Sequence, residues 1–266
     1  MKHFFIFLNK EILELWRSSK AVIVSTVFVC LSLMSVIVAK LMPEILRMAF
    51  ESDDLLEQMG LPPGSEYQPV DPVAFDSWVQ FFGNVGQLGL LTIVIMFGAS
   101  LVREKRQGTA ALLTARGLPR RVVVSGRLLS GIIMWSVAYW LAVGICYGCT
   151  LYYFPGETVE NMGLAVTTTW FYGVMLLCVA LWLSTLFKSS GGPVGITLAI
   201  LLLLPIFDMW PQWAKLSPNW LYQRGGMGLM DGSFVPMDSL APFLVTGGVC
   251  VVSVAGALVF FHYNEL

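Results

Sequence analysis

The 266-residue chain is 56% hydrophobic and only 12% charged, and its formal net charge is −1. This composition excludes an ordinary soluble globule, in which about a quarter of the residues are charged. The chain is therefore expected to fold in a lipid bilayer.

Long uncharged runs follow one another along the chain. Six windows of at least 19 residues contain no Asp, Glu, Lys or Arg: 21–39, 77–102, 128–156, 161–187, 189–207 and 239–264. A helix needs about 20 apolar residues to cross a bilayer, and these runs lack the alternation of β-barrel strands. We therefore predict an all-α membrane protein, one domain over 1–266, with spans at about 21–41, 80–102, 128–152, 164–187, 191–209 and 241–262.

Residues 2–18, which precede the first span, have the pattern of an amphipathic helix. Lys10, Glu14 and Arg17 form a charged stripe. The apolar stripe consists of Phe4, Phe5, Leu8, Ile12, Leu15 and Trp16. The pattern predicts an elbow helix lying in the cytoplasmic interface, with an extension free of the membrane as the alternative. The same charges interrupt any signal-peptide core, so no cleavage is expected.

Charge is distributed unevenly between the two sides of the predicted bundle. When the connections are assigned alternately, the side of the N-terminus holds 12 of the 16 basic residues but only 4 of the 17 acidic ones. Those basic residues are Lys2, Lys10, Arg17, Lys20, Arg103, Lys105, Arg106, Arg116, Arg120, Arg121, Arg127 and Lys188. The positive-inside rule makes this side cytoplasmic and places both termini there. We expect a multi-pass protein of the bacterial or archaeal cytoplasmic membrane.

Few polar residues lie near membrane depth. Asn84, Gln87 and Thr168 are candidates for a substrate path, although hydrogen bonding between helices is the favoured role. Small residues predict close packing in the second and third spans: Gly83, Gly86, Gly89, Gly144 and Gly148.

Several chemistries lack the residues they need. The only histidines are His3 and His262, and neither an HExxH zinc site nor a GxxxxGK[ST] nucleotide loop occurs. Cys146 and Cys149 form a CxxC inside an apolar run, which favours packing over metal binding. The centres of the spans hold none of the ionisable groups that mark an ion-coupled pump. We predict no catalytic residue, metal or cofactor in this chain and an energy source in another subunit.

The segment REKRQGTAALLTARGLPRR, residues 103–121, is the most cationic stretch between two spans. Gly108 or Thr109 can cap a short helix there, and Pro119 prevents its continuation. A helix of about two turns is unstable in water alone, so this one must pack against the membrane or a partner. The expected anchors are three leucines, Leu112, Leu113 and Leu118.

This segment also carries a motif. E-x-x-x-G-T, two leucines, and a proline followed by a basic residue, between the second and third spans, resemble the ABC-2 type transporter permeases. The residues concerned are Glu104, Gly108, Thr109, Leu112, Leu113, Pro119 and Arg120. The predicted elbow helix, six spans and cytoplasmic ends are also similar to that family.

The resemblance implies a permease subunit of an exporter. Residues 103–121 would contain a coupling helix that docks on a separate ATP-binding cassette subunit, which binds ATP and Mg²⁺. A second permease copy or a paralogue would complete a dimer. Membrane lipids are further expected partners, and nucleic acid is not one. The alternative from another class is a membrane-embedded accessory or assembly protein without its own transport pathway.

Overall fold

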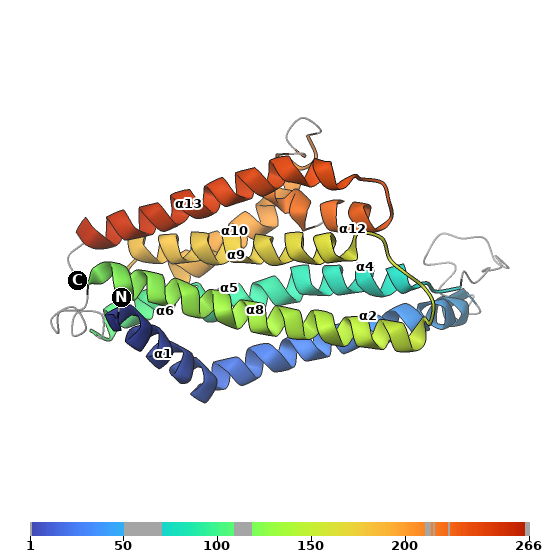
Figure 1. The fold of residues 1–266 in the computed structure, drawn as a ribbon, viewed down its shortest axis with the longest axis horizontal. Coiled ribbons are helices and arrows are strands. Elements are labelled where there is room, and N and C mark those ends of the chain that lie inside the picture. The colour runs from blue at the N-terminus through green and yellow to red at the C-terminus, as the bar shows by residue number, and fades with distance from the viewer. Residues whose placement is uncertain are drawn as a thin grey trace.

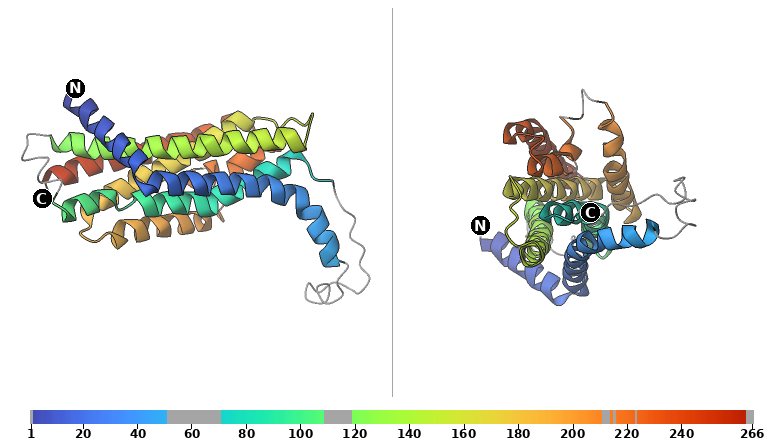
Figure 2. Two further views of the ribbon diagram at one scale, coloured as in Figure 1. Left: turned by 90° about the horizontal axis from the view of Figure 1, so that it is seen from below. Right: turned by 90° about the vertical axis from the view of Figure 1, so that its right-hand side faces the viewer.

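The computed structural model describes residues 2–50, 71–108, 119–210, 214, 216–222 and 224–263. Long helices run side by side, and the first and last helices have their outer ends at the same end of the bundle (Figures 1 and 2). We call this end the base; it contains the chain around residues 106, 120, 186 and 263. Throughout the described ranges the secondary structure is helical, without strands.

The elements follow one another in a simple order. The α-helices are α1 (Lys2–Arg17), α2 (Ser19–Phe50), α4 (Ala74–Asn84), α5 (Leu90–Phe97), α6 (Ser100–Arg106), α8 (Arg120–Tyr153), α9 (Met162–Leu186), α10 (Gly191–Phe207), α12 (Arg224–Met230) and α13 (Leu240–Tyr263). A π-helix, η1 (Val85–Gly89), joins α4 to α5. Two 3₁₀ turns, η2 (Pro218–Leu221) and η3 (Pro236–Ser239), flank α12.

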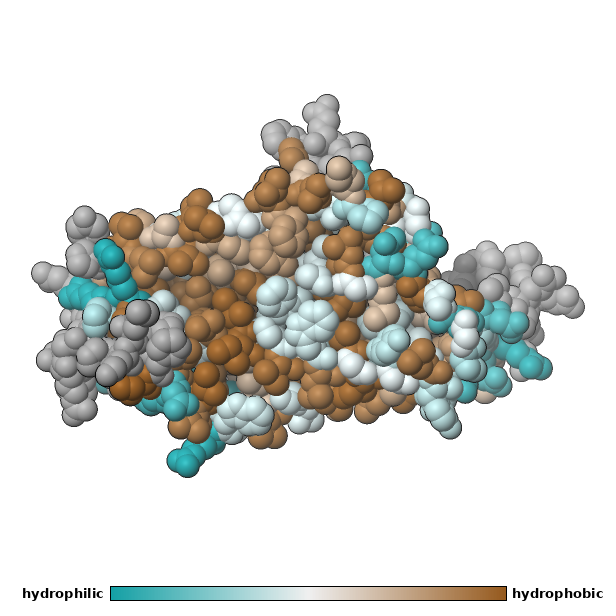
Figure 3. Space-filling model, in the orientation of Figure 1, coloured by the Kyte–Doolittle hydropathy of each residue, from teal (hydrophilic) through white to brown (hydrophobic). Residues whose placement is uncertain are grey.

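Five of the described helical stretches are long and apolar enough to cross a membrane. They are Ser19–Met48, Ala74–Arg106, Arg120–Tyr153, Met162–Leu186 and Pro236–Phe261. The predicted span at 191–209 corresponds to α10, whose 17 residues extend about 25 Å, less than the hydrocarbon thickness of about 30 Å. Apolar side chains cover the middle of the visible surface and hydrophilic ones gather toward its ends (Figure 3). The chain is a multi-pass integral membrane protein.

Three predicted spans differ from the helices observed. The first does not end near 41, because α2 continues through Pro43 to Phe50 and bends on the way (Figure 2). Leu41, Met42 and Glu44 are good helix formers, and a proline inside a long helix bends it without ending it. The second, predicted at 80–102, is α4, η1, α5 and α6 in succession, interrupted by a turn at 98–99. The third, predicted at 128–152, is α8, which already begins at Arg120.

Helix α9, the most buried of the five, packs against α8, α10, α12 and α13. Hydrogen bonds fix it to α8: Trp135 Nε1 donates to the Trp170 carbonyl at 3.0 Å, and the Tyr139 hydroxyl donates to the Val166 carbonyl at 2.9 Å. Trp135 also meets the Phe28 ring edge-on, with centroids 5.6 Å apart. Such bonds and tight packing hold helices together in lipid, where the hydrophobic effect does not.

Among the glycines predicted to allow close packing, Gly86 shows the closest approach. A Cβ built there would lie 1.5 Å from the Tyr222 hydroxyl oxygen. A Cβ at Gly89 would touch the Phe28 ring at 3.0 Å. Gly144 and Gly148, by contrast, are exposed and face open space, so the close packing predicted for them does not occur within the described chain.

Gly86→Ala is expected to lower the free energy of unfolding by about 1–3 kcal/mol, because the new methyl group forces Tyr222 from its place. Thermal unfolding of the purified protein in detergent checks this. Gly83→Ala is the matched control, since no described atom lies within 4 Å of a Cβ at that position. Alanine there should be neutral or slightly stabilising. Equal stability of the two variants would contradict the contact with Tyr222.

Candidate functional site: a buried ion cluster at the base

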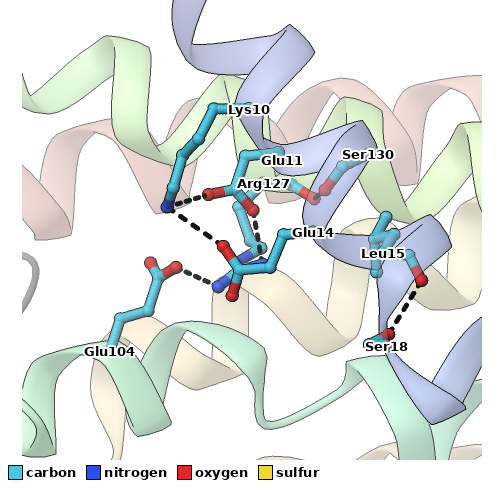
Figure 4. A network of polar contacts seen from close by, with 8 residues as sticks. All are labelled: Lys10, Glu11, Glu14, Leu15, Ser18, Glu104, Arg127 and Ser130. Atoms are coloured by element: carbon cyan, nitrogen blue, oxygen red, sulfur yellow. Dashed lines mark hydrogen bonds and ion pairs between the residues drawn. The ribbon is translucent and has the colours of Figure 1, made fainter.

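Three charged side chains from three helices meet at the base (Figure 4). Arg127 of α8 donates through Nη1 to Glu11 Oε2 of α1 at 2.6 Å, and through Nη2 to Glu104 Oε1 of α6. The exposed fractions of these side chains are 13% for Arg127, 0% for Glu11 and 9% for Glu104. We call Glu11, Glu104 and Arg127 the ion cluster. One guanidinium thus joins the elbow helix to the ends of two membrane spans.

The sequence of α1 explains why Glu11 points inward. Phe7, Glu11 and Leu15 lie one helical turn apart and are all buried. The Phe7 ring lies so close to Gly126 that a Cβ there would be 2.6 Å from it. Because Gly126 precedes Arg127, this close contact brings α1 against α8 where Glu11 can reach the guanidinium. The same contact between α1 and α8 therefore docks the elbow helix and brings Glu11 to Arg127.

The buried face of α1 differs in part from the predicted apolar stripe. Leu15 is buried, and Leu8 and Ile12 are half-buried. Trp16 is exposed on the isolated chain, because it lies about 100° around the helix from Leu15. The helix itself was predicted at 2–18 and is observed as α1. The side chains of Phe4 and Phe5 lie outside the described part of the structure.

Lys10 extends the ion cluster toward the surface. Its Nζ lies 3.2 Å from Glu11 Oε1 and 3.1 Å from Glu14 Oε2. Burial lowers the pKa of Lys10, but the hydrogen bond to Glu14 and the charge of Glu11 outweigh it and raise that pKa overall. The same hydrogen bond lowers the pKa of Glu14. Glu14 therefore stabilises the fold above the ordinary glutamate pKa, and this small, solvent-screened contribution is lost as the pH falls through its lowered pKa.

Two further cations, one at the end of α6 and one at the start of α8, contact the ends of other helices at the base. Lys105 Nζ donates to the Thr185 carbonyl at 3.0 Å, in the last turn of α9, and lies 5.2 Å from the centroid of the Phe261 ring. Arg120 Nη1 donates to the Phe261 carbonyl of α13 at 3.4 Å. The last carbonyls of a helix have no partner within it and carry partial negative charge, so a cation is favourable there.

The predicted coupling residues fall into two groups. Thr109, Leu112, Leu113 and Leu118 lie outside the described residues. Glu104 belongs to the ion cluster, and Arg120 begins α8 directly after its N-cap, Pro119. Gly108 has a φ of +69° and its N–H donates to the Lys105 carbonyl at 3.2 Å. It therefore closes α6 as a left-handed glycine. The short helix for which Gly108 or Thr109 was the predicted cap lies outside the described residues.

The three residues predicted for a substrate path each make a separate contact among the described residues. Asn84 Nδ2 donates to Ser35 Oγ at 2.9 Å, a hydrogen bond between α4 and α2 of the kind that the sequence favoured. The buried Thr168 hydroxyl donates to the Ala165 carbonyl within α9 at 2.9 Å. Gln87 lines a cavity beside α10. As for the CxxC, Cys146 is buried and Cys149 half-buried.

Glu11 and Arg127 were not predicted as site residues, because in the sequence they look like charges that set the membrane topology. The signal for Glu11 was its position one turn from both Phe7 and Leu15, which puts a carboxylate on the apolar face of the elbow helix. No comparable signal marks Arg127, since its partners lie 116 and 23 residues away in the chain.

No protein-family model matches the sequence. The chain is similar to the uncharacterized transmembrane protein YxlG of Bacillus subtilis, with 22% identity over 240 residues that cover 87% of each chain. The similarity extends over most of both proteins. It agrees with the membrane assignment and adds no activity to it.

Proposed function

We propose that this chain is the transmembrane permease subunit of an ABC exporter. A separate ATP-binding cassette subunit would bind ATP and Mg²⁺ and dock on residues 103–121. In this proposal α10 is the fifth of six spans, both termini are cytoplasmic, and the base faces the ATPase. A second copy of the chain, or a paralogue, completes the transporter. The permease itself then needs no catalytic residue.

The observation that carries the proposal is the attachment of both flanks of segment 109–118 to the bundle. Before the segment in the chain, Arg127 binds Glu104, and the end of α9 binds Lys105. After the segment, the end of α13 binds Arg120. A partner that displaces the segment therefore pulls on several helices at once, as the transmission of an ATP-driven movement requires.

The ion cluster supports the same role. Because Arg127 binds carboxylates from α1 and α6 together, a shift of α6 moves the elbow helix and the start of α8 with it. Packed and hydrogen-bonded elements of this kind pass a displacement on without absorbing it. An exposed loop between two spans would need no such cluster to hold the membrane topology.

Purification from native membranes tests the proposed function. We expect the tagged chain, extracted in mild detergent, to retain a subunit that contains an ATP-binding cassette, identified by mass spectrometry. Vesicles with both subunits should take up or release cargo only with hydrolysable ATP, and an ATPase variant unable to hydrolyse ATP is the control. ATP-dependent transport that persists in vesicles lacking this chain would instead support the accessory role.

A further inference from the structure

A cavity of about 240 Å³ lies between the second span and α10, away from the base. Its walls come from the π-helix η1 and α5 on one side, α10 on the other, and η2 at the end. The apolar lining includes Leu91, Leu198 and Leu202, and the polar lining consists of Gln87, Asn219 and Tyr222. The cavity thus has an apolar body and one group of polar side chains, the usual character of a small-molecule site.

A buried carboxylate stands behind the polar lining. Asp208, at the end of α10, is 6% exposed, and its Oδ2 accepts a hydrogen bond from Asn219 Nδ2 at 2.5 Å. Asn219 is itself 1% exposed and lines the cavity. Asp208 Oδ1 is buried and has no hydrogen-bond partner among the described residues. Asp208 does not itself line the cavity, so its charge acts on a bound molecule through Asn219, and a cation in the cavity offsets part of the cost of burying that charge.

The aromatic wall is held firmly in place. The Tyr222 ring stacks on the Tyr172 ring, with centroids 5.8 Å apart and planes 14° apart, while its hydroxyl fits against Gly86. The Tyr172 hydroxyl is also buried, and no hydrogen-bond partner for it is found in the described part of the chain. The adjoining π-helix is of a kind that occurs frequently at functional sites.

The mouth of the cavity opens on the side of the bundle. Leu202 and Gln87 are both exposed there. This lateral surface faces either lipid or a second subunit. A molecule that partitions into the bilayer can therefore enter between α5 and α10 without crossing the packed core.

We infer that this cavity binds a protonated organic amine with an apolar body. The ammonium group donates to the side-chain carbonyl of Asn219, one hydrogen bond away from the Asp208 carboxylate whose charge it offsets, and the body packs against the leucines of α5 and α10. The volume lies below the roughly 300–1,000 Å³ of drug-sized sites, so the ligand is small. In the proposed exporter this amine class is the cargo. That role rests on the proposed function, whereas binding itself does not.

Calorimetric titration of the purified full-length chain in detergent tests the inference. The probes are phenylbutylammonium and the uncharged phenylbutanol, which share an apolar body and differ in the head group. We expect the ammonium to bind roughly tenfold more tightly, the value of an attraction between opposite charges a few ångström apart in a partly buried site. In Asp208→Asn, which keeps the size of the side chain, the ammonium should bind no better than the alcohol. Glu160→Gln, which removes an exposed carboxylate elsewhere, should bind both as the wild type does.

Leu198→Trp provides a second variant, since it fills the cavity without touching the carboxylate and should weaken both probes alike. Equal affinity of the two probes in the wild type would overturn the inference. A preference for ammonium that survives Asp208→Asn would overturn it as well. None of these titrations needs an ATPase, so their failure leaves the purification test of the proposed function unaffected.

Discussion

Replacing Arg127 with methionine should lower the free energy of unfolding by about 3–5 kcal/mol, because it leaves two buried carboxylates without their shared cation. Glu11 and Glu104 approach the same guanidinium from α1 and α6, so in its absence they also repel each other. Thermal unfolding in detergent gives the loss of stability. We further expect α1 to detach first, which limited proteolysis near the N-terminus would detect.

Lys10→Met is the matched control for this variant. It removes a cation that also contacts Glu11, but one that is itself 55% exposed and leaves Arg127 in place, so a loss of at most about 1 kcal/mol is expected. Adding Glu11→Gln and Glu104→Gln to Arg127→Met should restore part of the stability, because it removes the two buried negative charges that Arg127 had balanced. If Arg127→Met is no more harmful than Lys10→Met, then water reaches the ion cluster and it does not lock the three helices together.

Arg127→Lys distinguishes geometry from charge. A guanidinium presents two nitrogens in a fixed fork, and Arg127 uses Nη1 for one carboxylate and Nη2 for the other. A lysine ammonium is a single point charge on a flexible stem, so it cannot hold both glutamates in the same positions. We expect intermediate stability and weaker attachment of the elbow helix.

The long helices could be predicted because the signal for a membrane span is local. Uncharged runs such as 128–156 and 161–187 are long enough for a helix to be the only structure that satisfies their backbone in lipid. The breaks within the second span could not be predicted. The π-helix lies against Tyr222, more than a hundred residues further along the chain, and a local sequence pattern does not reveal such a tertiary contact.

The ion cluster was predictable only in part, for a similar reason. Glu104 belongs to the motif that resembled a transporter family, and the structure places it in the ion cluster. Its partner Arg127 looked like one of many basic residues that set the topology. A count of charges predicts which side of the membrane a loop lies on, but it does not predict which cation becomes buried. Only the packing of Phe7 on Gly126 selects Arg127 from the others.

The double variant Leu112→Asp plus Leu113→Asp is expected to lose the ATPase subunit. If both leucines enter a groove of the partner, their replacement removes about 1.5–3 kcal/mol each, and together weakens binding roughly a hundredfold or more. Co-purification and ATP-dependent transport in vesicles are the measurements. The control is Ala111→Asp plus Thr114→Asp, which adds the same charge on the opposite face of the predicted helix at 100° per residue. Retention of the ATPase by the leucine variant, or equal loss in both variants, would contradict a docking role for the leucines.

The leucine double variant and Arg127→Met together distinguish residues that receive the ATP-driven movement from residues that stabilise the fold. The leucine pair lies in the connection between α6 and α8, outside the ion cluster, so its replacement should leave the unfolding temperature of the isolated chain unchanged. Arg127→Met should lower that temperature whether or not an ATPase is bound. If the leucine variant is fully stable yet inactive, the connection between α6 and α8 receives the movement. If the Arg127 variant is unstable, the ion cluster holds together the helices that carry this movement. If instead the leucine variant is also unstable, the segment is part of the fold itself, and the docking surface must lie elsewhere on the base.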